Sequence, residues 1–99
     1  MLESAIVQSI FKYLSSRPRS FTVKLHGSRY QKRGLPDILH ISEDLPRSVW
    51  FEVKRPGKSA TVLQQHRARE IGNAGGYAFT VTSVQEVSDA IQFIVRDLG

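Results

Sequence analysis

The chain has 99 residues and no cysteine, which fits one domain with a modest core and excludes disulfides, thiolate metal sites and a cysteine nucleophile. Fourteen Lys and Arg against nine Asp and Glu give a formal net charge of +5, which favours contact with polyanions. The sequence has neither a basic leader nor an apolar stretch that could span a bilayer, so we expect a soluble, cytoplasmic protein without a membrane partner.

The first part of the chain predicts a helix followed by a strand. Over residues 2–14, apolar side chains recur at the spacing of one helical face, which indicates an amphipathic helix. The polar stretch 15–20 should end this helix. Apolar and polar residues alternate over 21–25, which predicts a strand, and the polar loop 27–34 follows it.

The rest of the chain predicts three more strands and two more helices. Turn residues between the first two of these strands favour an antiparallel hairpin. Capping-box patterns, Thr61 with Gln64 and Ser83 with Glu86, open the two helices. In chain order, the predicted elements are strands at 38–41 and 49–53, a helix from 61 to the Gly75-Gly76 stop, a strand at 77–82 and a helix from 83 onward. This order indicates an α/β fold, a single domain over 1–99 with one mixed sheet flanked by helices.

The predicted hairpin brings three charged residues together. A turn centred on residues 44 and 45 places Asp37 opposite Glu52, and residues opposite each other share a face of the sheet. Lys54 follows one pleat later on the same side of its strand. Asp37, Glu52 and Lys54 should therefore converge at one edge of one sheet face.

Two opposed carboxylates at such an edge favour a metal site. They repel each other, and a divalent cation relieves the repulsion. Mg²⁺ prefers oxygen ligands, typically takes one or two carboxylates, and completes its shell with water and phosphate oxygens. The main-chain oxygen of Val53 is a further candidate ligand. A metal at this position can activate water and stabilise charge on a phosphodiester, and Lys54 is suited to contact the scissile phosphate or the attacking water.

Two more polar residues lie on core-facing helical stripes. Glu3 shares the stripe of Ile6 and Ile10, and Gln64 shares that of Ala68 and Ile71. Polar groups placed there need partners, and the edge of an active site would supply them.

The order of these residues resembles a known nuclease pattern. Glu3, Gly34-Leu35-Pro36-Asp37, Glu52-Val53-Lys54 and Gln64 together are similar to the PD-(D/E)XK superfamily and, more closely, to its VRR-NUC family of virus-type replication-repair nucleases. The resemblance covers nearly the whole chain. It implies a restriction-endonuclease-like αβββαβ core, dependence on Mg²⁺ or Mn²⁺, and hydrolysis of DNA.

The resemblance also implies a role for each motif residue. Asp37 and Glu52 would be metal ligands and Lys54 the catalytic lysine. Glu3 would be the helix carboxylate and Gln64 the glutamine that supports the site. Gln65 is the competing choice for that last role.

Small members of this family are similar to Holliday junction resolvases in motif order. Since a chain this short has little room to read a long base sequence, we expect a homodimeric endonuclease specific for branched DNA or Holliday junctions. The alternatives are restriction-like or nicking cleavage of ordinary duplex, and a catalytically inactive DNA-binding module. The cytoplasm would be the host's if the protein is viral. The predicted contacts to the DNA backbone are Arg17, Arg19, Arg29, Lys32, Arg33 and Lys58.

Each motif also has an ordinary structural interpretation. Glu52 and Lys54 could form a surface ion pair, and Pro36 and Asp37 are common turn residues. Glu3 could favour the positive end of a helix dipole. The joint placement of all of them on the predicted elements favours the nuclease. The histidines match no metal-ligand spacing, and packing or surface roles are expected for His26, His40 and His66.

Overall fold

The computed structural model describes residues 1–25 and 32–97. Along the chain, its helices and strands are α1 (Glu3–Ser15), β1 (Ser20–Lys24), β2 (Ile38–Ser42), β3 (Val49–Val53), α2 (Val62–Asn73), β4 (Tyr77–Val81) and α3 (Val84–Asp97). Their order is the predicted one, with small differences at the ends. None of these helices is long and apolar enough to cross a membrane.

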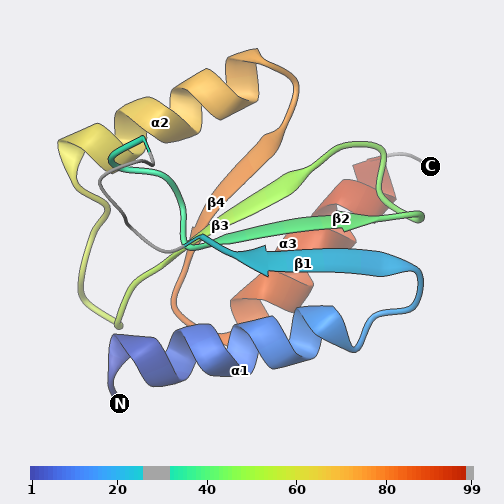
Figure 1. Ribbon diagram of the computed structural model, residues 1–99, viewed down its shortest axis with the longest axis horizontal. Coiled ribbons are helices and arrows are strands. Elements are labelled where there is room, and N and C mark those ends of the chain that lie inside the picture. The colour runs from blue at the N-terminus through green and yellow to red at the C-terminus, as the bar shows by residue number, and fades with distance from the viewer. Residues whose placement is uncertain (26–31, 98–99) are drawn as a thin grey trace.

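The strands of the described chain form one mixed sheet in the order β1-β2-β3-β4 (Figure 1). The pairs β1–β2 and β2–β3 are antiparallel, whereas β3–β4 is parallel. Ile38 pairs with Phe51 and Leu39 with Trp50, so the hairpin has the predicted register. The predicted α/β class is confirmed. The next step of the same register sets position 37 opposite position 52.

The main core lies between the sheet and the two helices α1 and α3. Helix α1 contacts β1, β2 and β3, while α3 contacts β4 and α1 (Figure 1). Each strand directs every second side chain to this face, and the helical stripes meet them there. The fully buried apolar side chains of this core include Ile10, Leu14, Ile38, Val49, Phe51, Val53, Val87 and Ile94.

Helix α2 contacts β4 and buries no residue completely. Its partly buried side includes Gln64, Ala68 and Ile71, the stripe predicted for this helix. A Cβ on Gly76 would come within 2.8 Å of Ile71 and 3.3 Å of the Trp50 ring nitrogen, so α2 packs on the Trp50 side of the sheet, opposite Phe51. One face of the sheet is therefore covered by α1 and α3 over the main core, and the other face is covered by α2, which buries less.

The segment before β2 is held against α2. Gly34 has a φ of +81°, and a Cβ there would come within 2.6 Å of Leu63 Cγ, so both the conformation and the close approach require glycine. Arg67 Nε donates a hydrogen bond of 2.8 Å to the carbonyl oxygen of Arg33. These contacts fix the path of the chain directly before Asp37.

Candidate active site

Asp37, Glu52 and Lys54 meet where β2 begins and β3 ends. The Asp37 main-chain nitrogen donates to Phe51 O at 2.9 Å, and Asp37 Oδ2 accepts from the Val53 main-chain nitrogen at 2.7 Å. Lys54 Nζ lies 3.7 Å from Glu52 Oε2. The structure therefore brings these three predicted site residues together at one end of the central strands.

Main-chain hydrogen bonds on both sides hold this end of the sheet in place. Leu25 N donates to Asp37 O at 2.7 Å, which joins Asp37 to the end of β1. Lys54 N donates to Val81 O at 2.9 Å, which joins Lys54 to the end of β4. All four strands thus contribute to positioning the site, and its backbone is hydrogen-bonded to both neighbouring strands.

The Glu52 carboxyl group is buried, and its hydrogen bonds and charge partners compensate that burial only in part. The residue is 6% exposed, and Oε1 has no hydrogen-bond partner within the described ranges, 1–25 and 32–97. Burial raises the pKa of Glu52 to about 8, and the charge and hydrogen bonding of Asp37 and the charge of Glu3 act in the same direction. Lys54 opposes this rise. A buried carboxyl group that keeps an unpaired oxygen costs free energy, so a structural role alone does not explain Glu52.

Glu3 belongs to the same cluster. It lies in the first turn of α1, half-buried, and it lines a pocket of about 390 Å³ together with Asp37. Its negative charge is one cause of the raised pKa of Glu52. The predicted convergence of the α1 carboxylate on the sheet edge is thus present in the structure.

Gln64 takes part in the helix cap. Its Oε1 accepts from Thr61 N at 2.9 Å, and its main-chain nitrogen donates to Thr61 Oγ1 at 3.1 Å, which is the predicted capping box. Gln65 is exposed and donates from Nε2 to Ala60 O at 3.0 Å. These contacts place neither glutamine against Asp37 or Glu52, so the supporting role of Gln64 stays a prediction, as does the choice between Gln64 and Gln65.

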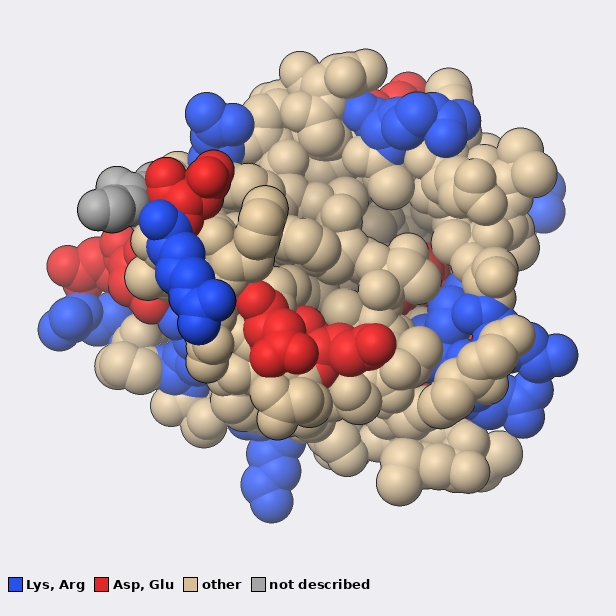
Figure 2. Space-filling view, turned by 180° about the vertical axis from the view of Figure 1, so that it is seen from behind, with Lys and Arg blue, Asp and Glu red and all other residues tan. Residues whose placement is uncertain are grey.

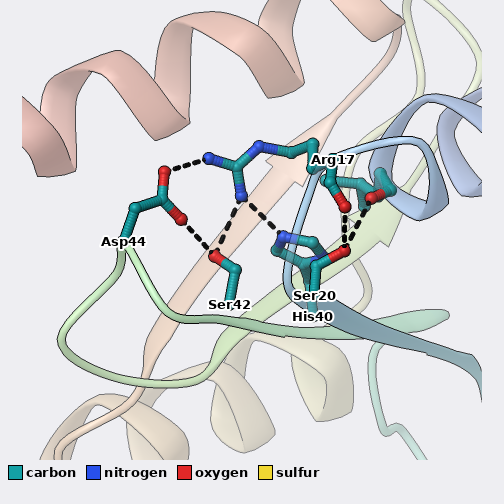
Figure 3. A network of polar contacts seen from close by, with 6 residues as sticks. Arg17, Ser20, His40, Ser42 and Asp44 are labelled. Carbon is teal, nitrogen blue, oxygen red and sulfur yellow. Dashed lines mark hydrogen bonds and ion pairs between the residues drawn. The ribbon is translucent and has the colours of Figure 1, made fainter.

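Arg17, a predicted DNA contact, turns its guanidinium inward (Figure 3). It donates to Ser42 Oγ at 3.0 Å, lies 2.8 Å from His40 Nε2 and pairs with Asp44. Because arginine can only donate, His40 Nε2 accepts, and the Nδ1 proton is donated to Thr22 Oγ1 at 2.8 Å. Burial, followed by the charge of Arg17, lowers the pKa of His40 to about 4, in agreement with this neutral form.

The other predicted DNA contacts are exposed or lie outside the described residues. Arg19 pairs with Glu43 at the surface, and Arg29 lies outside the described ranges. Lys32, Arg33 and Lys58 are exposed. Figure 2 shows one group of Lys and Arg side chains at the right, the side on which α1 and α2 begin in Figure 1, and others at the left and the lower edge. One of these groups therefore lies on the side of the molecule where α1, with Glu3 in its first turn, begins.

The donor set at this cluster fits a divalent metal ion. In the part of the chain that the structure describes, no three His, Asp or Glu side chains form a group that could hold a metal ion by themselves. Asp37 and Glu52 supply two carboxylates, and Glu52 Oε1 is a buried oxygen without a partner among those residues. Mg²⁺ needs few protein ligands beyond one or two carboxylates, since water and phosphate complete its shell. These residues therefore suit Mg²⁺ or Mn²⁺.

Solved structures with the same arrangement of elements identify the fold. One, described as a "VRR_NUC domain protein", matches with a TM-score of 0.76 at 18% sequence identity, covering 97% of this chain and 89% of the other. A second, described as a "VRR_NUC domain", has a TM-score of 0.72 at 22% identity, covering 91% of this chain and 94% of the other. The chain has the VRR_NUC fold.

The likeness extends over nearly the full length of both partners, so the VRR_NUC fold accounts for the core and for the surrounding helices together. The fold expected from the motif order is therefore confirmed. No family model and no curated protein matches the sequence.

One charged residue that lines the pocket was not among the predicted site residues. Lys24 lines the pocket that contains Glu3 and Asp37. It lies on the same side of β1 as Ser20 and Thr22, where the pattern over 21–25 has polar residues and gave no reason to expect a site. Its nearness to Asp37 depends on the pairing of β1 with β2, and the sequence argument set no register for that pair.

Proposed function

We propose that this protein is a metal-dependent DNA endonuclease of the PD-(D/E)XK class and a member of the VRR-NUC family. The observation that carries the proposal is the buried Glu52 carboxyl, which lies beside Asp37 and Lys54 and whose Oε1 has no partner in the described structure. The VRR_NUC fold supports the same function. A cluster of acidic groups that lowers the stability of the fold and has a perturbed pKa is typical of a catalytic site.

In this proposal Asp37, Glu52 and the main-chain oxygen of Val53 hold Mg²⁺, or Mn²⁺ in its place. When bound, the ion lowers the pKa of water and stabilises negative charge on the phosphodiester. Lys54 binds a non-bridging oxygen of the scissile phosphate or orients the attacking water. Glu3 orients water by accepting a hydrogen bond at the pocket wall. Gln64 supports the site from α2 with Nε2, because its Oε1 is used in the cap.

The proposed substrate is DNA, which the protein recognises by its shape rather than by its base sequence. The net charge of +5 favours a polyanion, and the short chain has little surface for reading bases. We propose branched DNA, with four-way junctions as the test case, and a two-fold homodimer that presents two active sites. Closed two-fold dimers are the commonest soluble assemblies, and their symmetry suits a junction.

Two alternatives differ in their observable outcome. Restriction-like or nicking activity on ordinary duplex would use the same active site. A catalytically inactive DNA-binding module would bind DNA without cutting it. The second is disfavoured because Glu3 and Asp37 place negative charge where DNA phosphates would approach, which weakens binding unless a cation is present.

The test is cleavage of labelled linear duplex, flap and four-way junction DNA, with the molar mass of the protein measured by light scattering. We expect a dimer that cuts branched DNA with Mg²⁺ or Mn²⁺ and is stopped by chelation. Ca²⁺ should bind without efficient turnover, because its larger and looser oxygen shell positions water and phosphate less tightly.

The control is Asp37→Asn, purified and assayed in parallel. Full activity in excess chelator, or equal activity of the control, contradicts the metal mechanism. A monomer that cuts duplex and junction equally contradicts the branched-DNA and dimer parts, and a dimer that cuts only linear duplex favours the restriction-like alternative. Binding without cleavage under every metal condition identifies the inactive module.

A further inference from the structure

The pocket beside the active site continues along α1 and β1 to a lysine. Its walls include Glu3 and Asp37 of the proposed active site, and also Gln8 and Lys24. The volume is about 390 Å³. The pocket therefore connects the position proposed for the scissile phosphate, at Asp37, with Lys24.

The backbone sets Lys24 close to the active site. Lys24 pairs with Ile38, the residue that follows Asp37, and Leu25 N donates to Asp37 O at 2.7 Å. Lys24 and Asp37 are thus on adjacent strands, one residue out of register. Their side chains leave opposite faces of the sheet, and it is the pocket at the end of the two strands that both residues line.

The Lys24 side chain is already held in position by neutral groups. Nζ donates to Gln8 Oε1 at 2.6 Å and lies 4.7 Å from the centroid of the Phe11 ring. In the described structure, the ion pairs of acidic residues use other cations than Lys24. An amide and an aromatic ring orient an ammonium group without cancelling its charge, so Lys24 remains able to bind an anion with its remaining donors.

We propose that Lys24 binds a backbone phosphate that flanks the scissile phosphate, and that Gln8 and Phe11 are positioning residues for it. This inference rests on the proposed function. Contact with a flanking phosphate is made equally before and during the reaction, so it contributes to substrate binding and leaves the chemical step unchanged. Lys24 therefore acts on KM, whereas Lys54 acts on kcat.

The experiment compares wild type, Lys24→Met and Lys24→Arg on oligonucleotides in which one phosphate at a time is a neutral methylphosphonate. Methionine keeps the apolar stem without the charge, and Lys12→Met, an exposed site on α1, is the matched control. We expect Lys24→Met to raise KM about tenfold with kcat nearly unchanged, as befits loss of one charged hydrogen bond. Arginine should restore most of the binding.

The decisive result is that the effect of one methylphosphonate depends on whether the Lys24 side chain is present. A single flanking methylphosphonate should weaken binding to wild type and to Lys12→Met but have no further effect on Lys24→Met. The slope of binding against salt should fall by about one unit in Lys24→Met. Identical methylphosphonate profiles in wild type and Lys24→Met, or a lowered melting temperature with unchanged KM, overturn the proposal in favour of a purely structural lysine.

The same oligonucleotides separate this proposal from the function on which it rests. If wild type cuts nothing with Mg²⁺ or Mn²⁺, the scan is carried out on Kd instead of KM. A position-specific loss in wild type and Lys12→Met that is absent in Lys24→Met then supports the Lys24 contact while the nuclease assignment fails. Absence of DNA binding by wild type overturns both.

Discussion

Two polar clusters lie near the two ends of strand β2, and they differ in how fully their polar groups are hydrogen-bonded. At one end, Asp37 meets Glu52 and Lys54, and Glu52 Oε1 has no partner in the described ranges. Further along, His40 and Ser42 are joined to Arg17 by hydrogen bonds (Figure 3). One end of β2 thus borders an open cluster, Asp37, Glu52 and Lys54, and the other carries part of a closed network.

This difference distinguishes a proposed catalytic site from a structural hydrogen-bond network. Burial is the largest cause of both perturbed pKa values: it raises that of Glu52 to about 8 and lowers that of His40 to about 4. His40 is neutral with both ring nitrogens bonded, so its burial is compensated. Glu52 has negative charge nearby and an unpaired oxygen, so the described residues leave its burial uncompensated.

The largest effect is expected from changing the open cluster. Asp37→Asn, Glu52→Gln and Lys54→Ala should each lower cleavage by about 10²–10³-fold or more, because each removes a charge that acts on the metal, water or phosphate. The fold and DNA binding should be largely retained. Rates are measured at matched Mg²⁺ with Glu43→Gln, an exposed acid at the far end of β2, as the control. Wild-type turnover in any of the three variants would contradict the assignment.

A change in the closed network should act on stability instead. Arg17→Met leaves His40 Nε2 and Ser42 without their buried donor, so the free energy of unfolding should fall by about 2–4 kcal/mol. Urea unfolding measures it, with Arg19→Met as the control, since the exposed Arg19–Glu43 pair contributes at most about 1 kcal/mol. Equal losses in the two variants would show that the network contributes no more than a surface ion pair.

The two clusters should give opposite pH dependences of stability in metal-free protein. His40 has a folded pKa of about 4, below its ordinary 6.5, so its contribution is complete above pH 6.5 and is lost as the pH falls towards 4. Glu52 has a folded pKa of about 8, above its ordinary 4.5, so its contribution is complete below pH 4.5 and is lost as the pH rises through 8.

The variant Glu52→Gln isolates the alkaline half of this curve. At pH 8 in chelator, its free energy of unfolding should exceed that of wild type by about 1–3 kcal/mol, because a neutral amide does not have to ionise in a buried place. The acid half, due to His40, should be unchanged. A variant less stable than wild type at pH 8 would mean that Glu52 stabilises the fold.

The smallest effects should come from single exposed cations on the side of the active site. Arg33→Met and Lys58→Met should each weaken DNA binding less than tenfold and lower the slope against salt by about one unit. Lys12→Met serves again as the control. Slopes unchanged in both variants would remove Arg33 and Lys58 from the proposed DNA surface.

The hairpin could be predicted because its information is local. Alternating residues and a short turn fix the register, and the register alone brings Asp37 opposite Glu52. The convergence of Glu3 followed from one helical stripe. The capping boxes predicted the starts of the last two helices, and Gln64 fills its cap as expected.

Other features depended on contacts between distant segments. The closed network needs Arg17, at the end of α1, to reach His40 across the sheet, and no spacing along the chain indicates that contact. The alternation that predicted β1 also did not show which face its apolar residues occupy. Phe21 is 63% exposed, and its cross-strand partner Ile41 is 46% exposed. The sequence likewise did not indicate that Lys24 lines the pocket, because that position depends on the pairing of β1 with β2.

The most direct test of the central claim is calorimetric titration of Mn²⁺ or Mg²⁺ into wild type and Glu52→Gln at pH 7, in two buffers of different ionisation enthalpy. If the open cluster is a metal site, wild type binds the ion and releases about one proton, because the raised pKa keeps Glu52 mostly protonated until the metal displaces the proton. Glu52→Gln should then bind far more weakly and release none. Equal binding by both proteins, or no binding by wild type, would contradict the account.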